Sequence, residues 1–275
     1  MSEEKEYQKY FLEFSYIGTN YHGWQIQKNG TSVQQYVNEK LSTILREDIS
    51  SMGSSRTDAG VHARQNFLHF ETIAEIENDF LRKLNFLLPR DIAVRNIFKM
   101  GMKSHARFDA ISRSYEYVLS YEKNPFIAEI ACFYPYYKLD VNILNDFSQL
   151  LFEHKDYAAF SKRRTTVKTT ICTISQAEWK VDAEKKTITF YVSSNRFLRG
   201  MVRGLVATMI AGGRQKLSKE NFIKLLNSSV NQKTDFSAPA NGLTLTTVKY
   251  PEGYFPEPLI ETIRYSENNL KESVR

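Results

Sequence analysis

The stretch Ser55-Arg56-Thr57-Asp58-Ala59-Gly60-Val61-His62-Ala63 lies between a segment of helical periodicity and an alternating segment at residues 66–71. Small residues on both sides of Asp58 let a ligand or another backbone approach closely, and Gly60 permits a turn with positive φ. Taken alone, the Asp-Ala-Gly triplet favours an Asx-turn in which Asp58 bonds its own backbone. The longer stretch also fits a loop that offers one carboxylate beside a fixed cation, Arg56.

The first half of the chain, on both sides of this loop, has an α+β pattern. Ser32 and Gln35 form a capping box before an amphipathic helix, and Asn78 is placed to cap a second helix that ends at Pro89. The pattern predicts strand, helix, strand, strand, helix and strand at residues 10–16, 33–45, just before 58, 66–71, 80–88 and 92–100. This β-α-β-β-α-β order is the ferredoxin-like arrangement, and we expect a first domain at residues 1–103.

The second half, residues 104–275, repeats an α+β pattern. We expect a strand, a helix, a hairpin and two further helices at residues 115–121, 140–153, 170–192, 196–211 and 219–227, followed by a loose tail after 251. Arg196, Arg199 and Arg203 form a stripe on the longer of the last two helices, at spacings of three and four. Solvent exposure is the simpler interpretation of this stripe, and we adopt it for Arg196 and Arg199.

Composition narrows the classes of function. The formal charge of +6, from 37 Lys and Arg against 31 Asp and Glu, favours a polyanionic partner. Cys132 and Cys172 lie far apart without a C-x-x-C pair, so we expect no disulfide framework, no metal site and a reducing compartment. No apolar run is long enough for a membrane helix, and the charged N-terminus does not resemble a signal peptide, so we expect a soluble cytoplasmic protein.

The string S-R-T-D-A-G-V-H-A resembles the catalytic loop of the TruA-type family of pseudouridine synthases that act on transfer RNA. Further strings repeat the resemblance over roughly residues 10–251, at Tyr21–Gln27, His105–Tyr117, Asp156–Phe160, Phe197–Arg203 and Ala238–Leu245. The resemblance implies a pseudouridine synthase fold, in which two ferredoxin-like α+β halves form an extended mixed or antiparallel sheet with a basic cleft. The chain departs from the family pattern at Ser55, where Gly is usual, at Ile17, where an acid is usual, and at Lys168, where Arg is usual. Ser55 would be strained if its φ had to be positive.

The resemblance implies that the protein isomerises uridine to pseudouridine in the anticodon stem-loop of tRNA, at the positions numbered 38 to 40. It implies no cofactor and gives the catalytic role to the Asp58 carboxylate. Arg203 would pair with Asp58, keep it ionised and orient it, while Arg56 would help to push the target nucleotide out of the stem. Tyr115, at the start of its strand, could stack on the flipped base, and Leu243 would line the uracil pocket.

The resemblance also implies a set of tRNA contacts and a homodimer. The tRNA-binding candidates besides Arg56 are His105, Arg107, Phe108, Arg113, Lys168 and Thr169. Other interpretations remain open: the arginines could form salt bridges to nearby acids, His105 could be a turn residue, and the basic loop at 161–170 could be plain surface.

Two other functions compete with the synthase. A non-catalytic RNA-binding module would use the same basic loop and aromatic residues, with Asp58 as an ordinary turn residue. A hydrolase with paired carboxylates is the weaker rival, because no second acid lies in a comparable motif. The sequence also leaves open whether Asp58 would attack C1′ of the ribose, attack C6 of the uracil, or act as a base.

Overall fold

The computed structural model describes residues 6–136, 138–162, 169–228 and 234–260. Its strands are β1 Gln8–Tyr16, β2 Met52–Gly53, β3 His62–Thr72, β4 Ile92–Met100, β5 Ser112–Ser120, β6 Cys132–Phe133, β7 Ile174–Asp182, β8 Thr187–Ser194 and β9 Leu243–Lys249. Its α-helices are α1 Val33–Leu45, α2 Phe80–Leu87, α3 Val141–Glu153, α4 Met201–Gly213 and α5 Lys219–Leu226, and two short 3₁₀ helices are η1 Ala158–Phe160 and η2 Ala240–Gly242.

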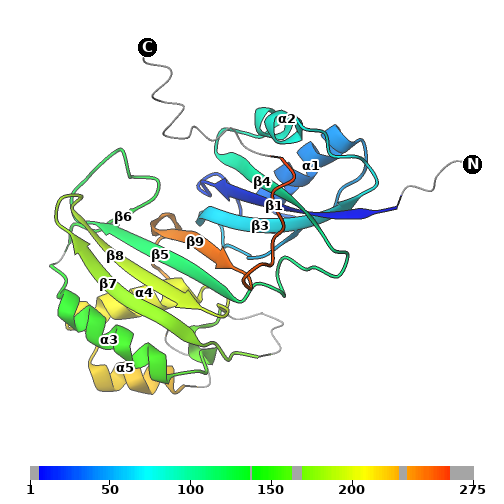
Figure 1. Cartoon of the computed structure of the whole chain (residues 1–275). Helices are drawn as coiled ribbons and strands as arrows, with labels where there is room; N and C mark the ends of the chain where they lie inside the picture. The colour runs from blue at the N-terminus through cyan, green and yellow to red at the C-terminus, as the bar shows by residue number, and fades with distance from the viewer. Residues whose placement is uncertain (1–5, 137, 163–168, 229–233, 261–275) are drawn as a thin grey trace, which may run out of the picture.

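One continuous sheet joins the two halves of the protein (Figure 1). Its strand order is β4-β1-β3-β9-β5-β8-β7, with β2 also paired to β3 and β6 to β5. The described pairs are antiparallel except β3 with β9 and β5 with β6. The expected α+β fold with an extended mixed sheet is therefore confirmed.

The two halves repeat one topology. In the first, β1-α1-β2-β3-α2-β4 gives the spatial order β4-β1-β3-β2; in the second, β5-α3-β7-β8-α4-α5-β9 gives β9-β5-β8-β7. Each half is thus a ferredoxin-like unit in which an antiparallel strand separates two parallel ones. The halves join where β9 pairs with the start of β3, at His62 with Thr244 and Ala63 with Leu245. We had not predicted β9 as a strand, so this junction was missed.

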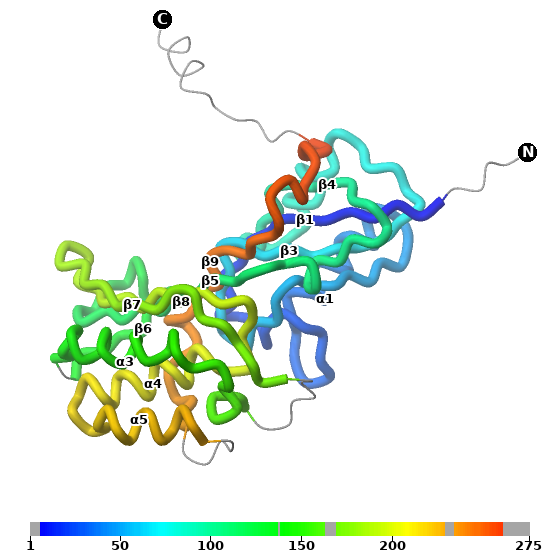
Figure 2. Tube along the Cα trace, turned by 60° about the horizontal axis from the view of Figure 1, so that its bottom comes forward, coloured from blue at the N-terminus to red at the C-terminus, as the bar shows by residue number. Residues whose placement is uncertain are grey.

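The sheet carries a hydrophobic core in each half. Successive side chains of β1 point to opposite faces, so Leu12 and Phe11 enter different layers of the first core. The ring of Phe11 packs edge-on against Tyr250, which follows β9, with the centroids 6.3 Å apart. Figure 2 shows this C-terminal segment crossing over β1 and β3, on the side of the sheet away from α3 and α5. The division at 103/104 stays a prediction, because Leu245 and later residues return to the first core.

Three local expectations need correction. The Ser32 hydroxyl accepts the Gln35 amide at 3.2 Å as predicted, but the Gln35 side chain donates to Glu39, so only half of the capping box forms. The N-cap of α2 is Asp79, not Asn78. The helix expected from residue 196 begins only at Met201, because its N-cap, Gly200, has φ +74° and interrupts the helical path.

Candidate active site

The Asp58 loop is held by the loop that follows β1. The amide of Trp24 donates to the carbonyl of Thr57 at 3.2 Å, and the amide of Gly60 donates to the carbonyl of Tyr21 at 3.2 Å. Gly23 has φ +85°, and a Cβ atom there would lie 2.5 Å from the Thr57 carbonyl oxygen, so only glycine allows this approach. Trp24 is 2% exposed and packs on the core, so it fastens the loop after β1 to the core.

Within the loop, the positive φ belongs to Gly60, at +77°, and not to Ser55. The family departure at Ser55 therefore carries no backbone strain. Ser55 is buried, and the neighbouring Ser54 hydroxyl donates to the Asn66 side chain at 2.7 Å. Among the described residues, the Asp58 carboxylate accepts no hydrogen bond from its own loop, and only its backbone carbonyl closes the turn, to the Val61 amide at 3.1 Å. The Asx-turn interpretation of Asp58 is therefore wrong.

The cation beside Asp58 is Arg199. Its Nε atom lies 3.9 Å from Asp58 Oδ1, with 60% of the Arg199 side chain and 23% of the Asp58 side chain exposed. Arg203 instead donates from Nε to the Ala238 carbonyl at 2.6 Å and from Nη2 to the Phe236 carbonyl at 3.2 Å. The expected pairing of Arg203 with Asp58 is thus wrong in this structure. Because α4 begins after Gly200, Arg199 lies on the turn before the helix, and its side chain is exposed as expected.

Tyr115 lies at the junction of the two cores, near Asp58. Its backbone pairs with Leu245 of β9, next to a bulge after Ser114, and its ring packs edge-on against Phe197 with the centroids 5.2 Å apart. Burial raises the pKa of the Tyr115 hydroxyl, the Asp58 carboxylate raises this pKa further, and the Arg113 guanidinium lowers it. The hydroxyl is therefore protonated at neutral pH and lies within the electric field of the Asp58 carboxylate.

Three arginines gather around the loop. Arg56 is exposed, while Arg107 and Arg196 are half-buried. Burial lowers the pKa of the Arg107 guanidinium, and the positive charges of Arg56 and Arg196 lower this pKa further, so both of these cations lie within electrostatic range of Arg107. We call Arg56, Arg107 and Arg196 the arginine cluster. Like charges held together in this way favour an anionic ligand such as a phosphate.

Arg113, which we expected to contact tRNA, is buried and bonded to the backbone. It is 9% exposed, and its guanidinium donates to four backbone carbonyls, at 2.8 Å to Ala110, 3.2 Å to Asn195, 3.2 Å to Ser54 and 2.6 Å to Arg107. These bonds tie the start of the Asp58 loop to two other segments. In this structure Arg113 is a scaffold residue with four donated bonds, and a tRNA contact through its side chain stays a prediction.

The turn at residues 104–110 contains the other RNA-contact candidates. Nδ1 of His105 accepts the amides of Arg107, at 3.1 Å, and of Phe108, at 3.3 Å, as expected of a turn residue. The carboxylate of Asp109 accepts the His105 amide at 2.7 Å and the Tyr254 hydroxyl at 2.6 Å. The Phe108 ring packs on the His105 ring, with centroids 4.2 Å apart, and is 75% exposed. Phe108 is thus presented to solvent as an aromatic surface.

The segment before β9 forms another wall of the site. Leu243 is 5% exposed and belongs to the second core, and a Cβ atom on Gly60 would lie 3.1 Å from the Cβ of Ala240. His62 fastens this segment to the rest: Nδ1 accepts the Gly18 amide at 2.9 Å, and Nε2 donates to the Asn241 carbonyl at 3.1 Å. We had assigned no role to His62. Its position directly after the Asp58 turn, in the string A-G-V-H-A, was the available signal.

Two predicted tRNA contacts, Lys168 and Thr169, lie in the basic loop, and several predictions concern metals, membranes and cysteines. Lys168 lies outside the described residues. Thr169 is the first described residue after it and is exposed. Within the described ranges, no three His, Cys, Asp or Glu side chains are grouped so as to hold a metal ion, and none of the helices has the length and apolar character needed to cross a membrane. Cys132 and Cys172 are both free and buried.

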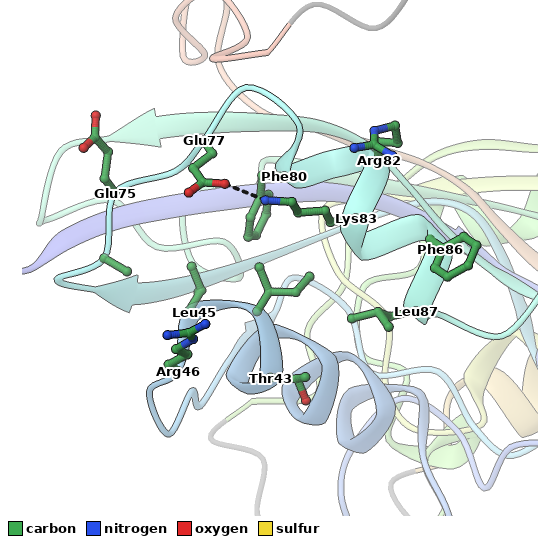
Figure 3. A pocket seen from close by; sticks show the side chains of 12 residues that line it. Thr43, Leu45, Arg46, Glu75, Glu77, Phe80, Arg82, Lys83, Phe86 and Leu87 are labelled. Atoms are coloured by element: carbon green, nitrogen blue, oxygen red, sulfur yellow. Dashed lines mark hydrogen bonds and ion pairs between the residues drawn. The ribbon is translucent and has the colours of Figure 1, made fainter.

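A hollow of about 640 Å³ lies between the end of α1 and α2 (Figure 3). Its walls include Ile44, Phe80, Phe86 and Leu87, and Lys83 at its rim is bonded to Glu77 at 2.6 Å. None of the candidate site residues lines it, and the basic cleft that we expected at the site stays a prediction.

Comparison with known proteins identifies the family. The family model described as tRNA pseudouridine synthase matches residues 14–109 and 149–251. The chain belongs to the tRNA pseudouridine synthase family. The synthase is 44% identical over 252 residues to tRNA pseudouridine synthase A of Bacteroides thetaiotaomicron, which covers 91% of this chain and 93% of that protein. It is 42% identical over 250 residues to the protein of that name from Bacteroides fragilis, and 41% identical over 251 residues to the one from Porphyromonas gingivalis, with 90% of this chain and 98% or 99% of those proteins covered.

The family model covers some of the candidate site residues and not others. The matched segments contain Asp58, Arg199, Arg203 and Leu243 but not Tyr115, which lies between them. The reaction of the family, the isomerisation of uridine in tRNA, makes this synthase an isomerase with tRNA as its partner.

Proposed function

We propose that Asp58 is the catalytic carboxylate of the synthase, and that Tyr115 and Leu243 flank the pocket for the flipped uridine. The observation that carries the proposal is the environment of the Asp58 carboxylate. This carboxylate is partly exposed on a loop fastened at both ends, it accepts no hydrogen bond from that loop among the described residues, it lies beside a cation, and its charge acts on the Tyr115 hydroxyl. Such a group is free to react while its position is fixed.

The chemistry needs one ionised carboxylate and no external reactant. The N1–C1′ bond of uridine breaks and a C5–C1′ bond forms, while the proton lost from C5 is balanced by the proton gained at N1. Asp58 could act at C1′, at C6, or as the base that removes the C5 proton. Tyr115 remains protonated at neutral pH, so its hydroxyl can donate a hydrogen bond to the substrate or to the carboxylate.

The arginine cluster would hold the backbone of the tRNA. Phosphate contacts fix the register of a nucleic acid, and the exposed Arg56, next to the Asp58 loop, is suited to support the displaced nucleotide. The exposed ring of Phe108 would stack on a base nearby. Following the family resemblance, we propose that the target lies in the anticodon stem-loop at positions 38 to 40, and that the synthase works as a homodimer in the cytoplasm.

The direct test is nucleoside analysis of an unmodified tRNA transcript after incubation with the synthase. We expect pseudouridine from the wild-type protein, none from Asp58→Asn, and tRNA binding within about threefold of wild type for that variant, because the amide keeps the shape and loses the charge. Glu75→Gln, which changes an exposed acid at the hollow between α1 and α2, is the matched control and should match wild type.

Other outcomes would overturn the proposal. Substantial turnover by Asp58→Asn would remove Asp58 from the chemistry. Release of free uracil would indicate the hydrolase, and unchanged nucleosides with intact binding would indicate an RNA-binding module. Transcripts with cytidine at positions 38, 39 or 40 locate the target, and light scattering at catalytic concentration tests the dimer.

A further inference from the structure

Arg199 is the nearest described cation to the Asp58 carboxylate, and the sequence pattern had left it to solvent. The distance from Nε to Oδ1 is 3.9 Å, which is within ion-pair range and longer than a hydrogen bond. The contact is therefore held by charge and not by a directional bond. It can be exchanged for another partner without loss of a hydrogen bond.

Both backbones that present this pair are fixed. On one side, the carbonyl of Arg199 accepts the Lys162 amide at 3.0 Å, and Gly200, with φ +74°, turns the chain into α4. A Cβ atom on Gly200 would lie 2.9 Å from the Lys162 side chain, so the turn is packed as well as bonded. On the other side, the Asp58 loop is bonded to Tyr21 and Trp24. The two fixed backbones thus place Arg199 within reach of Asp58, and the long Arg199 side chain spans the remaining distance.

Asp58 lies two residues after Arg56, and Arg199 lies three residues after Arg196, so the pair is next in the chain to two members of the arginine cluster, where RNA phosphates would bind. An uncompensated Asp58 carboxylate in that place would repel the phosphates that Arg56, Arg107 and Arg196 attract. With its side chain 60% exposed, Arg199 offsets this negative charge from the solvent side. Arg203 is held elsewhere in this structure, since its guanidinium donates to the carbonyls of Ala238 and Phe236.

We propose that Arg199 is a positioning residue for Asp58, which balances and holds the carboxylate in the free synthase so that the backbone of the tRNA can approach it. The inference rests on the proposed function of Asp58. The family pattern assigns the pairing with Asp58 to Arg203, whereas this inference concerns Arg199. It predicts that the contribution of Arg199 to RNA binding depends on the charge of Asp58.

A double-mutant cycle on tRNA affinity tests this dependence. The ligand is one transcript with cytidine at the modified position, so that no turnover occurs, and the proteins are wild type, Arg199→Ala, Asp58→Asn and the double variant at one fixed salt concentration. We expect Arg199→Ala to weaken binding at least about threefold more in the Asp58 background than in the Asp58→Asn background. Arg196→Ala, which removes a cation of the cluster, is the control and should weaken binding by the same factor in both backgrounds.

Arg199→Lys distinguishes a charge effect from a structural one. Because the pair lacks a hydrogen bond, lysine should keep most of the dependence on Asp58, unlike a site that needs the planar guanidinium fork. A cycle in which Arg199→Ala weakens binding equally in both backgrounds, or in which Arg199→Lys behaves as Arg199→Ala, would overturn the inference. These results are separate from the product analysis: if Asp58→Asn abolishes pseudouridine and the cycle is additive, only the role of Arg199 fails.

Discussion

The Nδ1 atom of His62 accepts the amide of Gly18 at 2.9 Å, while its Nε2 atom donates to the Asn241 carbonyl at 3.1 Å. One buried imidazole therefore connects the loop after β1, the end of the Asp58 turn and the segment before β9. Burial lowers the pKa of His62, in keeping with a neutral ring that accepts at one nitrogen and donates at the other. The site is assembled by such contacts between distant segments.

Replacing His62 by Ala should lower the free energy of unfolding by about 1–3 kcal/mol, because two buried backbone groups lose their partner. Urea denaturation measures this loss. His22→Ala, which changes an exposed histidine, should cost much less. Equal stability of the two variants would show that His62 does not hold the segments together.

His69 should make the protein less stable in acid. Its Nδ1 atom accepts the Ala106 amide at 3.1 Å, and burial, with the positive charges of His105 and Lys9, lowers the pKa of His69 from 6.5 to about 4. The unfolded chain binds a proton at a higher pH than the folded one, so this contribution to stability is complete above pH 6.5 and is lost as the pH falls toward 4.

The test for His69 is the melting temperature between pH 7.5 and 5. The curve for His69→Asn should fall less steeply than the wild-type curve, because the amide can accept the Ala106 bond without titrating. His22→Asn should retain the wild-type slope. If the slope of His69→Asn also matches wild type, protonation of His69 is not coupled to unfolding in this range.

Arg203→Ala should act on stability through the segment before β9. Two carbonyls, those of Ala238 and Phe236, lose their donor, so we expect a loss of about 1–3 kcal/mol in the free energy of unfolding. Arg203→Lys should recover only part of it, since a single ammonium replaces the guanidinium fork. Arg82→Ala, on the exposed face of α2, is the control. A variant as stable as this control would mean that the two carbonyl contacts do not support the fold.

Tyr115→Phe should separate catalysis from binding. The ring keeps its contact with Phe197, but the protonated hydroxyl near Asp58 is lost. We expect the single-turnover rate to fall at least about tenfold while tRNA affinity stays within about twofold. Tyr121→Phe, just beyond the end of β5, should leave both unchanged. Parallel losses of rate and affinity would make Tyr115 a structural residue.

Much of the fold followed from local sequence pattern. The strand period of residues 10–16, the capped helix after Ser32 and the two α+β repeats are set by which side chains recur on one face, and the structure has them. The Asp58 loop was also predicted, because small residues and glycines restrict what a short segment can do.

The contacts between side chains of distant segments could not be predicted from local sequence pattern. The sequence determined an amphipathic helix near Arg203, but the positive φ of Gly200 decided where it begins, and that start brings Arg199 to Asp58 and turns Arg203 to two carbonyls. Likewise, Arg113 is of the residue type that commonly binds phosphate, and only tertiary packing placed its guanidinium against four backbone carbonyls. Local pattern encodes periodicity and turn chemistry, whereas the partner of a long side chain depends on distances between segments far apart in the chain, which only the packed sheet fixes.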